Sequence, residues 1–508
     1  MPATRSIVAV LCLSVIVTAL GSATARPEST RATQATVAPT TVASNSIEPS
    51  QLDDGRWSPA AIDDALDGLQ SMRDDYRERR AFLRRGMSPT GKAPVTTTLD
   101  PTDQLGALPA PGLEHPYLTV EFQQELDLLT DSTLTAGNEM KMLLNQQSWK
   151  TKRDLIDAAQ SYVLVTAMVM RCDEGGEEFT KTMAAAAGRG VDTRFILDGL
   201  FSLYAFPCLE QMTEAGVKVS LSLRSLQPWS FDWEMHEKLL IVDGTQATIG
   251  GQNVGTWYQE ATGTDTYYRD TDVLLSGPIV RQIGRRFVNL WTQIEPEDRS
   301  LDGLLSEWDL IDADDERGGL IGPTNYGTML ETERPAGLCR FVAQDPHLGS
   351  FHVWSVYQAH LDAARERVML TAYALDPNGS ETQLAFREAL IALASKPGAR
   401  VDIITNGSGV LESEVVPSPF RRSYARSILT QAWQGLGKTP VNLWVYDYFM
   451  HAKQYYFDGL AVGIGSFNYD ASGNRCQESV IVCYDTDLVD DMETAFAVDI
   501  ANSALVSQ

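Results

Sequence analysis

The amino-acid sequence predicts an α/β protein built from two related halves, each a mixed, mainly parallel sheet flanked by helices. Helical segments alternate with buried, strand-like segments, which is typical of parallel sheets. The same order of segments occurs twice along the 508 residues. A hydrophobic content of 44% is ordinary for a globular protein and allows a large core.

The first residues predict a signal peptide. Arg5 supplies a positive charge, residues 7–20 form an apolar stretch, and residues 23–25 (Ala-Thr-Ala) form a small-residue cleavage site. The apolar stretch is shorter than the roughly 20 residues that span a bilayer, which disfavours the alternative of an uncleaved membrane anchor. We therefore expect residues 1–25 to be removed and the protein to be periplasmic or secreted.

Residues 26–115 are predicted to form a disordered linker and one helix. The segment 26–50 is rich in Thr, Ala, Ser and Pro, and it has too little apolar surface to offset the entropy lost on ordering. Residues 58–85 place apolar side chains at helical spacing and end before Gly86. The main body then divides into a first half, residues 116–325, and a second half, residues 326–508.

Each half repeats the order helix, strand, helix, strand. In the first half these segments are residues 153–160, 162–170, 177–189 and a strand that ends at 195–199. In the second half, residues 356–375 cover the first helix and strand, residues 383–395 the next helix, and residues 402–407 the end of the next strand. The sequence thus indicates an internal duplication.

Charge and cysteine content limit the function. The formal net charge is -26, so the average field repels nucleic acid and anionic lipid surfaces, although it leaves room for a local basic pocket. Of six cysteines, Cys12 lies in the predicted signal peptide. The other five allow one or two disulfides and leave at least one thiol outside them, and their spacing matches no zinc site.

One motif occurs at the same place in both halves. It has the form H-x-K-x4-D, followed by two small residues and then, after one further residue, by Asn. The first copy comprises His236, Lys238, Asp243, Gly250, Gly251 and Asn253, and the second comprises His451, Lys453, Asp458, Gly465, Ser466 and Asn468.

This residue set suits the transfer of a phosphodiester. Residues two apart on a strand share a face, so the His and Lys of each copy project together. One neutral imidazole can attack phosphorus, a second imidazolium can protonate the leaving oxygen, and two ammonium groups can stabilise the nonbridging oxygens. Asn253 and Asn468 would bind the same oxygens, and the chemistry requires neither metal nor cofactor.

Acidic residues follow each copy of the motif. A carboxylate bonded to the far ring nitrogen of a histidine fixes its tautomer and raises its basicity. We favour Asp270 and Glu478 for this task, with Asp272 as an alternative to Asp270. Structural roles are predicted for the remaining motif residues Asp243, Asp458, Gly251 and Ser466, and for the other histidines, His115, His347, His352 and His360.

The doubled motif resembles that of the phospholipase D superfamily, and the likeness extends from about residue 128 onward. GGQNVG (250–255), RDTDVLLSGPIV (269–280) and GSFNYD (465–470) are most similar to bacterial cardiolipin synthases of its phosphatidyltransferase branch. The segment after Asn468 departs from these relatives: it lacks their Pro-Arg-Ser and Asn-Thr-Glu and is one residue shorter.

The resemblance implies a duplicated phospholipase D fold with a pseudo-twofold axis, and a displacement through a phosphohistidine. By analogy His236 is the nucleophile and His451 the acid, although the roles can be reversed. We expect an exported enzyme that cleaves glycerophospholipids by hydrolysis, transphosphatidylation or both. The alternatives are a nuclease and a noncatalytic phospholipid-binding protein. The expected partners are a phospholipid and, transiently, a membrane surface, but not nucleic acid. Both motifs lie in one chain, which predicts a monomer.

Overall fold

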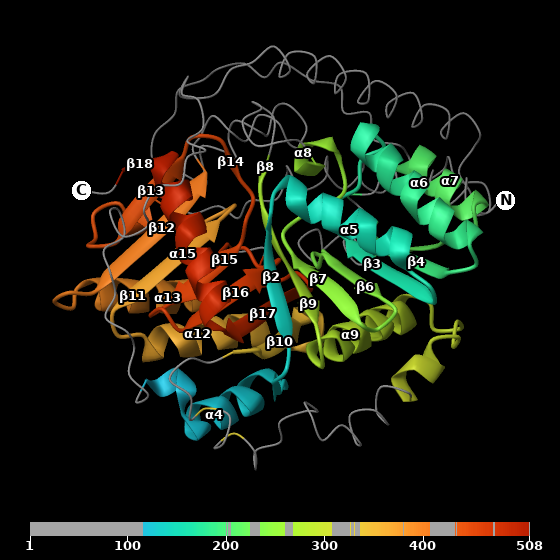
Figure 1. Cartoon of the computed structure of the whole chain (residues 1–508). Coiled ribbons are helices and arrows are strands. Elements are labelled where there is room, and N and C mark those ends of the chain that lie inside the picture. Colours follow the sequence, from blue (N-terminus) through green and yellow to red (C-terminus); the bar gives the residue numbers. More distant parts are fainter. Residues whose placement is uncertain are drawn as a thin grey trace, which may run out of the picture. The chain divides into compact units, whose positions relative to one another are not determined.

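Two large mixed sheets flanked by helices, together with a two-stranded sheet of β8 (Tyr268–Arg269) and β14 (Phe449–Met450), make up the part of the chain that the computed structural model describes (Figure 1). The described residues are 115–199, 201, 205–223, 234–259, 268–306, 326, 330, 336–378, 380–406, 432, 434–470 and 473–506. They all belong to one unit of the chain. The predicted signal peptide, the linker and the helix at residues 58–85 lie outside them.

The first sheet has seven strands in the order β2-β9-β7-β6-β3-β4-β5. Only β3, β4 and β5 pair in parallel; they are connected by α6 (Glu174–Gly188) and α7 (Phe206–Glu214). The strands are β2 (Glu139–Leu144), β3 (Tyr162–Ala167), β4 (Asp192–Asp198), β5 (Lys218–Ser222), β6 (Leu239–Val242), β7 (Gln246–Gly250) and β9 (Thr271–Ser276).

The second sheet has nine strands in the order β1-β10-β17-β16-β15-β11-β12-β13-β18. Its parallel strands are β11, β12 and β13. The strands are β1 (Leu134–Thr135), β10 (Leu338–Gln344), β11 (Arg367–Ala372), β12 (Arg400–Asn406), β13 (Asn442–Tyr446), β15 (Gln454–Phe457), β16 (Ala461–Gly465), β17 (Glu478–Tyr484) and β18 (Ser503–Leu505).

The strand order confirms the duplicated α/β fold, because β9-β7-β6-β3-β4-β5 corresponds strand for strand to β17-β16-β15-β11-β12-β13. The prediction that parallel pairing dominates is wrong. Each motif strand turns back at an Asp-Gly pair, where Asp243 and Asp458 have φ of 51° and 53°, and it therefore forms a hairpin. Such turns connect antiparallel strands, and three of the five strand pairings in each repeat are antiparallel.

Several of the helices begin at residues whose side chains cap the first turn. Asp173, Ser380 and Asp485 accept hydrogen bonds from the first turns of α6, α13 (Glu381–Ala394) and α15 (Thr486–Ala501). The remaining long helices are α5 (Gln146–Ala158), α9 (Ile279–Ile294) and α12 (His352–Ala363). Among the described residues, no helix combines the length and apolar content needed to cross a bilayer.

The segment that precedes β2, the first strand of the first sheet in chain order, packs against the second sheet. It comprises η3 (Pro116–Leu118), α4 (Val120–Thr130) and β1, which pairs with β10. Tyr117, Phe122 and Leu126 are buried in the core of the second half. The sequence interpretation assigns this stretch to the first half, whereas its apolar side chains extend the second.

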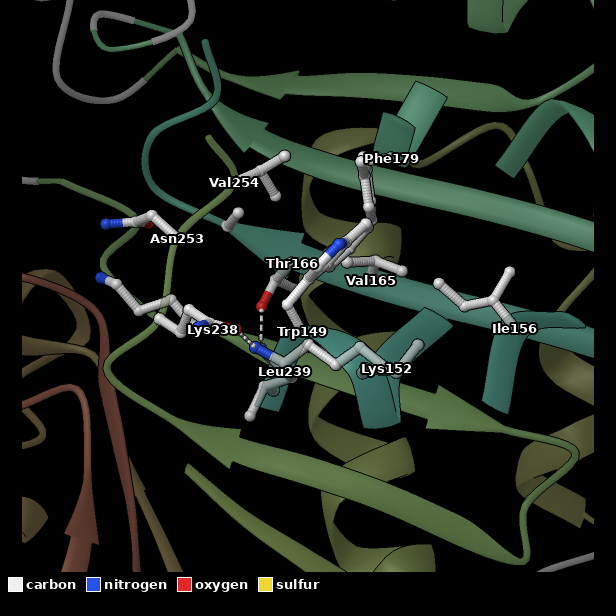
Figure 2. A pocket seen from close by; sticks show the side chains of 13 residues that line it. Trp149, Lys152, Ile156, Val165, Thr166, Phe179, Lys238, Leu239, Asn253 and Val254 are labelled. Carbon is white, nitrogen blue, oxygen red and sulfur yellow. Dashed lines mark hydrogen bonds between the residues drawn. The ribbon is translucent and has the colours of Figure 1, made fainter. Parts of the chain in front are cut away.

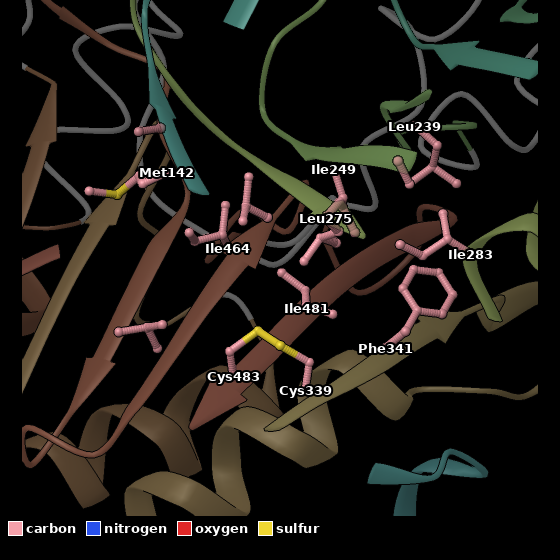
Figure 3. Packing of buried hydrophobic residues seen from close by; sticks show 14 of the residues in the cluster. Met142, Leu239, Ile249, Leu275, Ile283, Cys339, Phe341, Ile464, Ile481 and Cys483 are labelled. Carbon is pink, nitrogen blue, oxygen red and sulfur yellow. A yellow bond between two sulfur atoms is a disulfide. The ribbon is translucent and has the colours of Figure 1, made fainter. Parts of the chain in front are cut away.

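One apolar core is shared by the two sheets. Ile249 and Leu275 of the first sheet belong to the same buried cluster as Ile464 and Ile481 of the second, as Figure 3 shows. Helices α9 and α15 contribute large side chains to this cluster, including Phe287. The two halves are thus joined by continuous packing, which brings the two motif hairpins together.

Two disulfides answer the question of cysteine pairing that the sequence leaves open. Cys172 is bonded to Cys208, and Cys339 to Cys483, which is its direct neighbour across β10 and β17. The second bridge lies within the shared core (Figure 3). Cys476 carries a buried thiol outside these bridges.

Candidate active site

The two His-Lys pairs occupy equivalent places in the sheets. His236 and Lys238 lie just before β6, and His451 and Lys453 lie between β14 (Phe449–Met450) and β15. Because β6 and β15 run antiparallel to β3 and β11, these positions fall at the carboxyl ends of the parallel strands, where α/β proteins bind their ligands. All four side chains belong to residues that are at most 5% exposed.

Each histidine is held at its backbone by the opposite half. His236 N donates a hydrogen bond to the carbonyl of Gln477 at 3.0 Å, and His451 N donates to the carbonyl of Arg269 at 2.8 Å. These acceptors directly precede Glu478 and Asp270. The strand that carries the carboxylate of one half therefore lies against the histidine of the other.

The carboxylate of each half likewise contacts the histidine of the other half. His236 Nδ1 is hydrogen-bonded to Glu478 Oε2 at 3.0 Å, and His451 Nδ1 to Asp270 Oδ2 at 2.7 Å. Asp270 and Glu478, the residues favoured from the sequence, are thus the ones that contact the histidines. The sequence does not predict that each carboxylate pairs with the histidine of the other half. In both histidines it leaves Nε2 on the far side of the ring from the carboxylate.

The lysines are buried close to the imidazoles. Lys238 Nζ donates to the carbonyl of His236, and Lys453 Nζ lies 2.6 Å from the carbonyl of His451 and 3.1 Å from its Nε2. Burial, and then the charge of Lys453, lower the pKa of Lys238 to about 7. Burial followed by Lys238 holds the pKa of His236 well below its usual value. These mutual effects show that the four groups share one electrostatic environment.

The two carboxyl groups differ in their proton affinity. Burial raises the pKa of Glu478 to about 7, against the opposing effect of Lys238. Burial also acts to raise the pKa of Asp270, but His451 and Lys453 outweigh it and lower this pKa. His451 therefore has an ionised partner, whereas Glu478 titrates near neutrality.

The motif asparagines and small residues lie around this centre. Asn253 Oδ1 accepts from Val169 N at 3.0 Å, and its Nδ2 donates to the Tyr258 hydroxyl at 3.4 Å. Asn468 Oδ1 is buried and accepts no hydrogen bond from the described residues. A Cβ at Gly251 would overlap Asp270 Oδ1, so the close approach requires glycine. The Ser466 hydroxyl donates to Glu478.

Asp243 and Asp458, for which the sequence predicts structural roles, accept hydrogen bonds from backbone N–H groups. Asp243 accepts the N–H groups of residues 160–162 at the start of β3, and Asp458 accepts those of residues 365–367 at the start of β11. The bonds reach a neighbouring strand rather than the local turn. His115 and His360, also predicted to be structural, bond to Asp458 and to the Tyr484 hydroxyl.

Asp272 does not contact either motif histidine. Its carboxylate accepts from the Ser148 hydroxyl and forms an ion pair with Lys152. Because Asp270 takes the position beside His451, the alternative assignment of Asp272 is wrong. In the described part of the chain, no group of three or more His, Cys, Asp or Glu side chains is arranged to hold a metal ion.

Aromatic side chains around His451 were missed by the sequence analysis. Tyr258 packs edge-on at 5.2 Å between ring centroids, Tyr373 lies at 5.4 Å, and Tyr268 and Phe449 stack at 6.1 and 6.3 Å. Tyr268 and Phe449 each stand two residues before a site residue, Asp270 and His451. This alternation on adjoining strands is the signal that could have identified them.

The duplicated fold and the two His-Lys pairs with exchanged carboxylates define an enzyme of the phospholipase D superfamily. The family model described as "Cardiolipin synthase, PLD-like domain" matches residues 153–291 and 357–500, which is more than half of the chain. The chain belongs to this family.

Individual relatives agree with this assignment. Cardiolipin synthase A of Pseudomonas aeruginosa is 25% identical over 387 residues, which cover 74% of this chain and 69% of the relative. A probable cardiolipin synthase of Bacillus subtilis is 25% identical over 386 residues, covering 74% and 68%. The crystal structure of phosphatidylserine synthase from Haemophilus influenzae has a similar fold, with a TM-score of 0.55 and 13% identity over 76% of this chain and 92% of its own.

Proposed function

We propose that this protein is an exported phosphodiesterase and phosphatidyltransferase that cleaves the distal phosphodiester bond of glycerophospholipids through a phosphohistidine. The observation that carries the proposal is the buried pair of His-Lys units, in which the Nδ1 atom of each histidine is bonded to a carboxylate. In this proposal both Nε2 atoms act on one phosphate. The lipid substrate is supported by the cardiolipin synthases among the relatives.

In the first step His236 Nε2 attacks phosphorus. A P–N bond forms while the P–O bond to the leaving alcohol breaks, and His451 gives its Nε2 proton to that oxygen. Lys238 and Lys453 stabilise the negative oxygens, and the amides of Asn253 and Asn468 donate to them.

In the second step the acceptor is water or an alcohol. His451, now neutral, takes the proton of the acceptor, whose oxygen attacks phosphorus as the P–N bond to His236 breaks. Water gives hydrolysis, and an alcohol gives a new phosphodiester. The enzyme returns to its starting protonation state in both cases.

The charges at the site support these roles. The lowered pKa of His236 keeps its imidazole neutral and nucleophilic. His451 faces Asp270, whose lowered pKa keeps it ionised and able to stabilise an imidazolium. Lys453 Nζ lies 3.1 Å from His451 Nε2, and a bound phosphate oxygen would draw this ammonium away from the ring.

Export is supported by two features. The first residues have the pattern of a signal peptide. The two disulfides are of a kind that persists in oxidising compartments and is rare in the cytosol. Sequencing the N-terminus of protein recovered outside the cytoplasm tests this part: cleavage near residue 25 is expected, and an intact N-terminus in a cytosolic fraction would contradict it.

The activity is tested with purified protein in the presence of a chelator. We expect it to release the head-group alcohol from phosphatidylcholine or phosphatidylglycerol and to leave single-stranded DNA intact. Cleavage of DNA alone would favour the nuclease alternative, and inertness toward all three would favour a binding protein. Enzyme denatured with detergent at alkaline pH should carry substrate-derived phosphorus in a form that is stable to base and labile to acid; its absence would argue against the phosphohistidine.

A further inference from the structure

A buried polar cluster lies behind the first motif and takes no part in the steps above. Lys152 Nζ on α5 lies 2.6 Å from Asp272 Oδ2 and 3.3 Å from Gln252 Oε1. The side chains of Lys152 and Asp272 are 15% and 1% exposed. The Ser148 hydroxyl also donates to Asp272. The cluster is therefore an ion pair inside the protein, with further polar groups around it.

Gln252 connects this ion pair to the catalytic groups. It directly precedes Asn253, and its N–H donates to Asp272 Oδ1 at 3.2 Å. Its side-chain Nε2 donates to the carbonyls of Asn145 at 3.1 Å and Tyr258 at 2.7 Å. Asn145 Oδ1 in turn accepts the N–H of Asp270 at 2.9 Å. One amide side chain thus joins the phosphate-binding Asn253 to the carboxylate partner of His451.

The second half fills the equivalent place with aromatic and aliphatic side chains. Asp272 pairs with Gly250 across the sheet, and the residue that pairs with Gly465 is Val480. Phe467 precedes Asn468 as Gln252 precedes Asn253. Tyr357 stands as far before β11 as Lys152 stands before β3. Tyr357 and Phe467 pack with their ring centroids 6.0 Å apart.

This difference shows that the fold does not require the ion pair. Apolar residues fill the equivalent volume in the same architecture, and a buried ion pair is on average no more stabilising than an apolar replacement. Stability is therefore a poor explanation for Lys152 and Asp272. Their hydrogen bonds to Gln252 give the alternative explanation, which is that they orient Gln252.

The cluster does not bind the lipid itself. Lys152, Lys238 and Asn253 border one cavity of about 20 Å³ (Figure 2). This is room for about one water molecule, so neither an acyl chain nor a head group fits. Lys152 therefore borders Lys238 and Asn253 at a cavity that has no room for lipid.

We propose that Lys152 and Asp272 are positioning residues for the reaction: the ion pair fixes Gln252, and through it the amide of Asn253 and the carboxylate of Asp270. This proposal rests on the proposed function for its reaction. Loss of the pair would misplace groups that act on the transition state, so kcat should fall while KM changes little.

The first test replaces the cation. Lys152→Met should lower kcat by about 10- to 100-fold, as loss of supporting contacts commonly does, and should change KM by less than about threefold. Lys152→Arg should restore most of kcat. Lys150→Met on the same helix is the matched control, because Lys150 forms an exposed pair with Asp154, and it should behave as the parent. Parental kcat in Lys152→Met, or an effect on KM alone, would overturn the proposal.

A second variant separates orientation from folding, because Lys152→Met leaves the buried Asp272 unpaired. Lys152→Met/Asp272→Val carries the valine of the second half and should keep a Tm within about 3 °C of the parent, yet remain slow. A parental kcat in this double variant would refute the positioning role. A chromogenic phosphodiester serves as a further substrate. If the parent cleaves it but no phospholipid, the proposed lipid function fails while the positioning test still stands.

Discussion

The exchanged carboxylates favour one tautomer of each motif histidine, because each is hydrogen-bonded to Nδ1. Asp270 accepts from His451 Nδ1 at 2.7 Å, so an amide in its place would donate to this nitrogen or lose the bond. We expect Asp270→Asn to lower kcat by roughly 10³- to 10⁴-fold, because the wrong tautomer is then favoured. Turnover of phospholipid at constant pH measures the effect, with Tm as the control for folding. A loss of less than about tenfold would contradict the role of Asp270.

The lowered pKa of Lys238 predicts how kcat/KM declines at alkaline pH. Its pKa is lowered to about 7, so the ammonium that stabilises phosphate oxygens is lost as the pH rises through that value. kcat/KM reports the free enzyme and should therefore decline above about pH 7. In Lys238→Arg the guanidinium stays charged, so the decline should move to higher pH even if the maximum rate is lower. An unchanged alkaline limb in this variant would assign it to another group.

The residues of the site differ in how readily the sequence predicts them. His236, Lys238 and Asn253 recur at fixed offsets in the second copy, so their identity follows from the repeat. The repeat does not tell which carboxylate pairs with which histidine, because Glu478 and His236 are separated by 242 positions. Lys152 has the appearance of an ordinary helix lysine, and only its contact with Asp272 distinguishes it.

At the scale of elements, the Asp-Gly hairpins hold each motif strand to its neighbour. Asp243 and Asp458 each bind three backbone N–H groups at the start of an adjacent strand, and both have positive φ. Asn tolerates this backbone conformation but offers one side-chain acceptor where the carboxylate offers two.

We therefore expect Asp243→Asn and Asp458→Asn to lower the free energy of unfolding by about 1–3 kcal/mol. The kcat of the folded fraction should stay within about threefold of the parent. Denaturant unfolding measures the first and a folded-fraction-corrected assay the second. Parental stability with a collapsed kcat would assign these residues to the chemistry instead.

Helix and strand alternation predicts most of the elements but not their direction. The helix expected at 177–189 lies within α6 apart from its last residue, and the one expected at 383–395 lies likewise within α13. The preference for parallel sheets fails at β6-β7 and β15-β16, because an Asp-Gly turn connects each pair as an antiparallel hairpin. The position of α4 against the second half depends on long-range packing, which local periodicity does not encode.

At the scale of the whole molecule, the shared core predicts that neither half provides a site alone. Each chain contains both exchanged pairs, so His236→Asn and His451→Asn chains cannot complement one another as monomers. A mixture of the two variants should show no more activity than the sum of both alone, with parental Tm values confirming that they fold. Recovery of activity on mixing or co-refolding would indicate that halves are exchanged between chains.

The exchange of carboxylates between the halves also determines when the site can be completed during synthesis on the ribosome. His236 is synthesised 242 residues before Glu478, an interval on the order of ten to fifty seconds at ordinary elongation rates. Throughout that interval the histidine lacks the group that orients it, and His451 has not yet been made for most of it. A chain abandoned at any earlier point is therefore inert. The site is therefore complete only after the last strands of the chain have been synthesised.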